Sequence, residues 1–123
     1  MKKKDLITGI MGQDGAYLAK FLLAKNYKVY GAYRRNSNYE NNRLRKLKIE
    51  NQIELVDSEI NEFASVNYLI NKIKPDEIYN LAAMSFVASS FKQPMYTINT
   101  NFFAVLNLLE VIKNSKKNIS LYQ

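Results

Sequence analysis

The chain has 123 residues, a length that fits a single domain, and 47% of them are hydrophobic, enough to fill a core. Its formal net charge is +7, but the Lys and Arg residues are scattered and no nucleic-acid-binding module is visible, so no nucleic-acid partner is expected. The absence of Cys and His excludes disulfides, thiolate chemistry and imidazole catalysis, and no metal site is predicted.

No apolar run approaches the roughly 20 residues that a membrane-spanning helix needs. The apolar stretch after the basic residues 2–4 is interrupted at Gly9 and is too short for a signal peptide. The sequence therefore predicts a cytoplasmic protein with no membrane partner.

Short extended runs and helical periods alternate along the chain. The pattern predicts strands at residues 5–8, 27–33, 53–56, 77–81 and 119–123, and helices at 16–25, 43–49 (a short helix or turn), 62–73 and 94–113. Residues 36–42 are expected to form a polar loop. The side chains of the last helix expected to face inward are those of Phe102, Val105, Leu106, Leu109 and Ile112.

This alternation predicts an α/β fold of the Rossmann-like, doubly wound type. Right-handed connections between parallel strands give the expected strand order 3-2-1-4-5, incomplete at about five strands. Ligands of such sheets bind at the carboxyl ends of the strands, near the switch between the first and fourth strands. The first glycine-rich turn and the segment after Leu81 are therefore expected to meet there.

Three of the four glycines lie between the first strand and the first helix, in the sequence Gly9-Ile10-Met11-Gly12-Gln13-Asp14-Gly15. Glycine permits a tight turn and a close approach of a ligand to the backbone. The helix that follows offers unpaired N–H groups and the positive end of its dipole. Although the spacing G-x-x-G-x-x-G differs from the commoner G-x-G-x-x-G, its context predicts a diphosphate-binding turn. An ordinary turn between a strand and a helix is the alternative.

Arg34 and Arg35 follow the second predicted strand, where an acidic residue would bind the ribose of NAD. Arginines at this point suit the 2′-phosphate of NADP, and Asn36 and Ser37 would add hydrogen bonds. Residues 34–39 contain neither Asp nor Glu. The pattern predicts NADP as the cofactor; a solvated loop is the alternative.

Four segments occur in the same order as in a known family: residues 7–18 (ITGIMGQDGAYL), the Arg pair, residues 74–85 (KPDEIYNLAAMS) and residues 121–123 (LYQ). Together they resemble the GDP-mannose 4,6-dehydratases of the extended short-chain dehydrogenase superfamily, over nearly the whole chain. The resemblance implies that a GDP-hexose, with GDP-mannose expected, is converted to its 4-keto-6-deoxy form. In that reaction NADP takes a hydride from sugar carbon 4, water leaves across carbons 5 and 6, and the hydride returns to carbon 6.

The resemblance also implies site residues. Glu59 and Ile60 would contact the adenine, with Asp57 as an alternative in a shifted register, and Ser85 would face the sugar substrate as well as the cofactor. Three positions depart from the family pattern, namely Glu59 for Asp, Met11 for Thr and Phe86 for a polar residue. The complete set of expected cofactor-binding residues is Gly9, Ile10, Met11, Gly12, Gln13, Asp14, Gly15, Arg34, Arg35, Asn36, Ser37, Glu59, Ile60, Leu81, Ala82, Ala83, Ser85 and Tyr96.

The family's catalytic Thr and Glu and its Tyr-x-x-x-Lys pair are expected after Gln123, so no catalytic residue is assigned within this chain. We interpret residues 1–123 as the NADP-binding N-terminal domain of a longer enzyme, inactive by itself and homo-oligomeric at full length. Two alternatives stay open. One is another nucleotide-sugar dehydratase or epimerase of the superfamily, and the other is a non-catalytic module that senses NADP(H).

Overall fold

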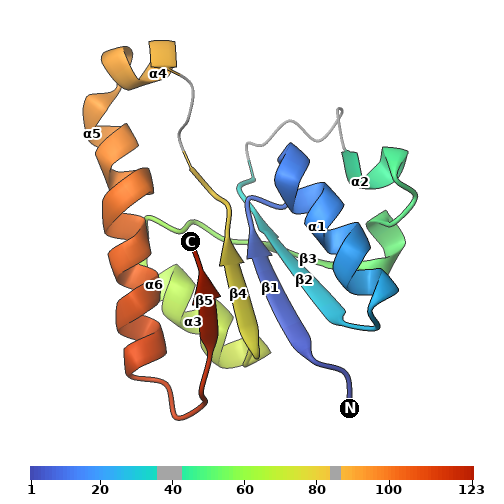
Figure 1. Ribbon diagram of the computed structural model, residues 1–123. Coiled ribbons are helices and arrows are strands. Elements are labelled where there is room, and N and C mark those ends of the chain that lie inside the picture. The colour runs from blue at the N-terminus through green and yellow to red at the C-terminus, as the bar shows by residue number, and fades with distance from the viewer. Residues whose placement is uncertain (36–42, 84–86) are drawn as a thin grey trace.

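A computed structural model describes residues 1–35, 43–83 and 87–123 (Figure 1). Its five strands form one parallel sheet in the order β3-β2-β1-β4-β5, which confirms the predicted Rossmann-like topology. The strands are β1 (Lys4–Thr8), β2 (Lys28–Tyr33), β3 (Glu54–Asp57), β4 (Glu77–Asn80) and β5 (Ser120–Tyr122).

Helices connect the strands and cover both faces of the sheet (Figure 1). They are α1 (Gln13–Ala24), α2 (Arg43–Lys46), the short 3-10 helix η2 (Glu50–Gln52), α3 (Phe63–Ile73), α4 (Val87–Lys92), α5 (Pro94–Ile98), the π-helical segment η3 (Asn99–Phe103) and α6 (Ala104–Lys113). The sequence did not predict α4. Among the described residues, none of the helices has both the length and the apolarity that crossing a bilayer requires.

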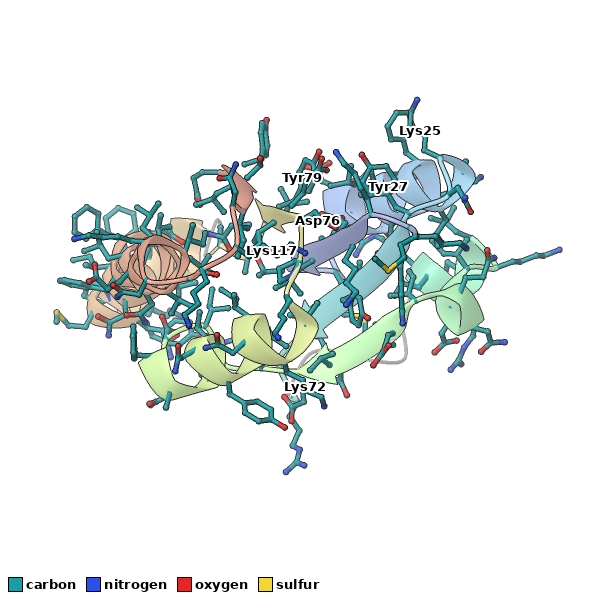
Figure 2. All side chains as sticks on the ribbon, turned by 90° about the horizontal axis from the view of Figure 1, so that it is seen from below. Lys25, Tyr27, Lys72, Asp76, Tyr79 and Lys117 are labelled. Atoms are coloured by element: carbon teal, nitrogen blue, oxygen red, sulfur yellow. The ribbon has the colours of Figure 1, made fainter. Side chains whose placement is uncertain are left out.

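The central strand β1 contributes to two separate cores. Leu6 packs with residues of α3 and α6 on one face of the sheet, whereas Ile7 packs with residues of α1 on the other. Successive side chains of a strand point to opposite faces, and both of these side chains are fully buried. Figure 2 shows α1 and α3 on opposite sides of the sheet, with the labelled Tyr27 and Tyr79 on the side of α1. A continuous apolar run such as 6–7 is thus the signature of a strand covered twice.

Asp76, just before β4, contacts residues at the start of β1 and before β5. Its carboxylate accepts a hydrogen bond from the Lys4 backbone N–H at 2.8 Å and lies 3.0 Å from the Lys117 ammonium nitrogen (Figure 2). Just before it, Lys74 adopts a left-handed conformation (φ 52°) that ends α3. These contacts set the register at the amino-terminal edge of the sheet, opposite the edge where the glycine turn lies.

The predicted inward face of the last helix is wrong at three positions. Phe102, Leu106 and Leu109 are 58%, 45% and 47% exposed, while Val105 and Ile112 are half-buried. The residues of α6 that are buried instead are Ala104, Leu108 and Val111. Because the apolar residues of this helix cover more than the side that meets the sheet, its periodicity does not identify that side.

Candidate functional site

The glycine turn lies at the carboxyl edge of the central strand, between Thr8 at the end of β1 and Gln13 at the start of α1. The turn is closed by the Gly12 N–H, which donates to the Gly9 carbonyl oxygen at 3.0 Å. Gly12 is also the N-cap of α1, and among the described residues no side chain caps this helix end. Since the first N–H groups of a helix have no partners within it, α1 presents backbone donors and a positive dipole end at the turn.

Glycine occupies the three positions of the turn for different physical reasons. Gly9 has φ +68°, and a Cβ there would lie 2.7 Å from the carbonyl carbon of Leu81. A Cβ on Gly15 would lie 2.5 Å from the Gly9 carbonyl oxygen, so this glycine lets α1 pack against the turn. Gly12 is exposed, with a φ of −73°, and a Cβ there would meet only the Gly9 carbonyl oxygen, at 3.2 Å. The fold therefore requires Gly9 and Gly15, whereas Gly12 is the least restricted of the three, with a single tight contact to the turn's own carbonyl oxygen.

A cleft of ≈ 240 Å³ opens beside this turn, between the carboxyl ends of the strands and the helical segment α5–η3. Pockets that enclose a small ligand are typically about 300–1,000 Å³, so a dinucleotide would be only partly enclosed here. The residues that line the cleft are Thr8, Gly9, Met11, Gly12, Ala32, Tyr33, Arg34, Ser58, Glu59, Ile60, Asn61, Leu81, Ala82, Ala83, Tyr96 and Thr100.

The two adjacent arginines after β2 have different surroundings. The Arg34 guanidinium carbon lies 5.3 Å from the centre of the Tyr96 ring, and both residues line the cleft. Arg35 is not part of the cleft lining, and its Nε lies 3.5 Å from the Asp57 carboxylate. Arg34 therefore lies at the cleft, while Arg35 pairs with the end of β3.

The loop after β3 is held by hydrogen bonds within the loop and to side chains of α3 and η3. The Glu59 N–H donates to Ser65 Oγ at 3.2 Å, and the Glu59 carboxylate accepts the Asn61 N–H at 3.1 Å. Asn61 Nδ2 in turn donates to Thr100 Oγ1 at 3.2 Å, which joins the loop to η3. The Glu59 carboxylate thus stabilises the loop that forms this part of the cleft wall.

Ten of the predicted residues lie together at the cleft, namely Gly9, Met11, Gly12, Arg34, Glu59, Ile60, Leu81, Ala82, Ala83 and Tyr96. Ile10 is fully buried and packs against Gly31, where a Cβ would lie 2.6 Å from the Ile10 side chain. Gln13 lines a separate hollow beside α2, and Asp14, Gly15 and Arg35 line neither hollow. Outside the described residues are Asn36, Ser37, Ser85 and Phe86.

Six residues of the cleft lining were not predicted from the sequence. Thr8, Ala32, Tyr33 and Ser58 lie at or next to strand ends, so the rule that ligands bind at the carboxyl ends of parallel strands would have found them. Asn61 and Thr100 come together only through the packing of η3 against the loop after β3, and no local sequence signal marks that contact.

The sequence matches known proteins along nearly its whole length. A family model described as GDP-mannose 4,6 dehydratase matches residues 6–123. The GDP-mannose 4,6-dehydratase of Vibrio cholerae is 40% identical over 130 aligned residues, covering 100% of this chain and 35% of that protein. The Cricetulus griseus GDP-mannose 4,6 dehydratase is 42% identical over 118 residues, covering 91% of this chain and 32% of that protein. The chain thus spans about a third of the length of these relatives.

Solved structures share the fold. The UDP-glucose 4-epimerase of Thermotoga maritima, solved with UDP-glucose, has a TM-score of 0.80 at 22% identity. The match covers 96% of this chain and 37% of the epimerase chain. The Bordetella bronchiseptica enzyme WbmH, solved in complex with NAD+, has a TM-score of 0.72 at 29% identity. The match covers 92% of this chain and 36% of the WbmH chain. With the family model matched from β1 to the last residue, the chain belongs to the GDP-mannose 4,6-dehydratase family.

Proposed function

We propose that residues 1–123 form a dinucleotide-binding domain and that the cleft beside the glycine turn binds NADP. The observation that carries this proposal is the N-terminus of α1 at the cleft, where Gly12 is exposed and no side chain among the described residues caps the helix. Space above an uncapped helix N-terminus is what a diphosphate requires, because it accepts hydrogen bonds from the backbone and is attracted by the helix dipole.

The strand order supports one orientation of the dinucleotide. With the diphosphate at the turn after β1, the two halves of the ligand extend toward the neighbours of β1 on either side, β2 and β4. The side of β2 and β3 offers Arg34, Glu59 and Ile60 for the adenosine half. The side of β4 offers Leu81, Ala82 and Ala83, whose small side chains permit a close approach of the nicotinamide half.

The basic end of β2 supports NADP over NAD. Arg34 lies over the Tyr96 ring at the cleft, where a guanidinium can bind a 2′-phosphate through parallel hydrogen bonds or stack on the adenine. Neither Asp nor Glu occurs at residues 34–39, so no carboxylate in this segment would repel the phosphate. Asn36 and Ser37 stay proposed as additional ligands of that phosphate.

For the whole protein we propose the dehydration of a GDP-hexose, with GDP-mannose as the substrate. NADP would supply a reversible hydride acceptor, and the residues of this chain would bind and orient it. Membership of the dehydratase family favours this reaction over epimerisation, since the epimerases at 22% identity share only the fold. A module that only senses NADP(H) would bind the same cofactor without turnover.

We also propose that the protein forms homo-oligomers through the outer side of its long helical segment. Met95, Ile98, Phe102, Leu106 and Leu109 are 45–66% exposed and recur every three or four residues, and we call them the apolar stripe. Such spacing is typical of a helix that packs against another helix. A contiguous row of exposed apolar side chains is typical of a surface that another protein surface covers. A second copy of the same helix has the matching pattern.

Two measurements test the proposed function. Calorimetric titration of the chain with NADP is expected to give one binding site per chain, and no detectable binding by the folded chain would contradict the cofactor proposal. Incubation of the full-length protein with GDP-mannose and NADP is expected to yield the 4-keto-6-deoxy product, with UDP-glucose as the control substrate. Binding of NADP without any turnover of GDP-mannose would favour the sensor instead.

A further inference from the structure

Three polar side chains from neighbouring strands form a hydrogen-bonded line next to the cleft. The Thr8 hydroxyl at the end of β1 donates to Asn80 Oδ1 at 2.5 Å, and Asn80 Nδ2 at the end of β4 donates to Gln123 Oε1 at 2.7 Å. Thr8 and Asn80 are only 1% and 3% exposed. Buried polar groups are costly unless each is paired, so this line fixes the orientation of the Thr8 and Asn80 side chains, while Gln123 accepts at its exposed end.

The line begins at the cleft wall. The Ala82 N–H donates to Thr8 Oγ1 at 3.2 Å, and the Leu81 N–H donates to the Thr8 carbonyl oxygen at 3.3 Å. The Thr8 hydroxyl therefore accepts from the wall and donates to Asn80, so both of its functions are used. Since β4 ends at Asn80, residues 81–83 lie beyond the strand ladder and depend on such contacts for their position.

We propose that Thr8, Asn80 and Gln123 form a positioning relay that holds residues 81–83 against the glycine turn and joins their position to the end of β5. The relay rests on the proposed function, because its role is to place the wall against which the nicotinamide half of the dinucleotide lies. Asn80 and Gln123 are not in the cleft lining and act through Thr8 and Ala82. In the proposed orientation the adenosine half would lie on the other side of β1, beside β2 and β3 and away from the relay.

This separation allows a test with two ligands. NADP occupies both sides of β1, whereas adenosine 2′,5′-bisphosphate occupies only the side of β2 and β3. In Thr8→Val the side chain keeps its shape but loses the hydroxyl, leaving the Ala82 N–H and Asn80 Oδ1 without this partner. Thr8→Ser keeps the hydroxyl and is the matched control. Gln123→Ala removes the exposed end of the relay without altering the core.

For Thr8→Val we expect NADP to bind about tenfold more weakly, as for the loss of one buried hydrogen-bond partner, while the bisphosphate binds as to the wild type. Thr8→Ser, which keeps the hydroxyl, is expected to bind NADP as the wild type does. Gln123→Ala is expected to weaken NADP binding severalfold and to leave bisphosphate binding unchanged. If Thr8→Val does not fold, Gln123→Ala alone tests the relay. Equal weakening of both ligands, or unchanged NADP binding in Gln123→Ala, overturns the relay. A folded wild-type chain that binds neither ligand overturns the proposed function instead.

Discussion

Gly9 and Leu81 touch backbone to backbone across the floor of the cleft. A Cβ on Gly9 would lie 2.7 Å from the Leu81 carbonyl carbon and 2.8 Å from the Ala82 nitrogen, closer than such atoms approach in folded proteins. Gly9 also has a φ of +68°, in the left-handed region that side chains disfavour. The turn after β1 and the segment after β4 therefore meet only because this position lacks a side chain.

Gly9→Ala is expected to destabilise the chain by about 3 kcal/mol or more, since it combines left-handed backbone strain with overlap against the Leu81 backbone. Gly12→Ala is the matched control, because its φ of −73° suits any residue and its Cβ would meet only the Gly9 carbonyl oxygen. We expect that change to cost less than about 1 kcal/mol. Thermal unfolding of the two variants measures the difference, and similar stability losses would contradict the assigned roles.

Arg34→Ala is expected to reduce the preference for NADP over NAD by about 10- to 100-fold, the value of one hydrogen bond from a charged group. Arg35→Ala is expected to change this ratio far less, since Arg35 pairs with Asp57 outside the cleft lining. Affinities for NADP and NAD measured on both folded variants decide between the arginines. An unchanged ratio in Arg34→Ala would remove the physical support for NADP.

Asp5→Asn is expected to stabilise the chain at neutral and alkaline pH. The Asp5 side chain is fully buried in β1, and neither carboxylate oxygen has a hydrogen-bond partner among the described residues. Burial, with a smaller contribution from the charge of Glu77, raises the pKa of Asp5 from 3.8 to about 7. The folded state therefore holds this proton more tightly than the unfolded state, and stability falls as the pH rises through that window.

Asp5→Asn removes that penalty, so we expect a gain of about 1–3 kcal/mol near pH 8 and little change near pH 4. Asp76→Asn is the control of opposite sign, because the hydrogen bond from the Lys4 backbone N–H, followed by that from Lys117, lowers the pKa of Asp76. Its stabilisation is present above the unfolded-state pKa and disappears as the pH falls. Thermal unfolding across the pH range checks both, and a destabilised Asp5→Asn at alkaline pH would contradict the first.

Leu106→Glu is expected to shift the protein from oligomer to monomer, because a carboxylate in the apolar stripe would be desolvated on association. Phe21→Glu on α1 is a matched control, since Phe21 is 56% exposed but lies outside the stripe. Sedimentation velocity over a dilution series measures both variants. A wild-type chain that stays monomeric, at full length as well, would refute the proposed interface.

The sheet was predictable because its signals are local. Buried runs such as 6–7 and 29–32, punctuated by the glycine turn and by Pro75, specify the strands, and right-handed connections then give their order. The facing of the last helix was not predictable, because Leu106, Leu108 and Leu109 are equally apolar. Which of them meets the sheet depends on packing between α6 and α3, and sequence periodicity does not contain that information.

The candidate site was predictable where it depends on the chain's own turns. The glycine turn and Arg34 follow directly from strand ends, so their place at the cleft could be inferred. The contact between Asn61 and Thr100 joins residues 39 positions apart, and the different surroundings of Arg34 and Arg35 depend on Tyr96 and Asp57 from other elements. Such pairings arise only when the helices have packed.

The measurement that tests the central claim most directly is the calorimetric titration of the wild-type chain and of Gly12→Val with NADP, with thermal unfolding to verify that both are folded. The branched valine side chain would add bulk at the exposed N-cap of α1, where the diphosphate is proposed to lie. We predict one NADP per wild-type chain and no detectable binding by the variant. Equal affinities in two folded proteins would contradict the claim that this turn binds the diphosphate.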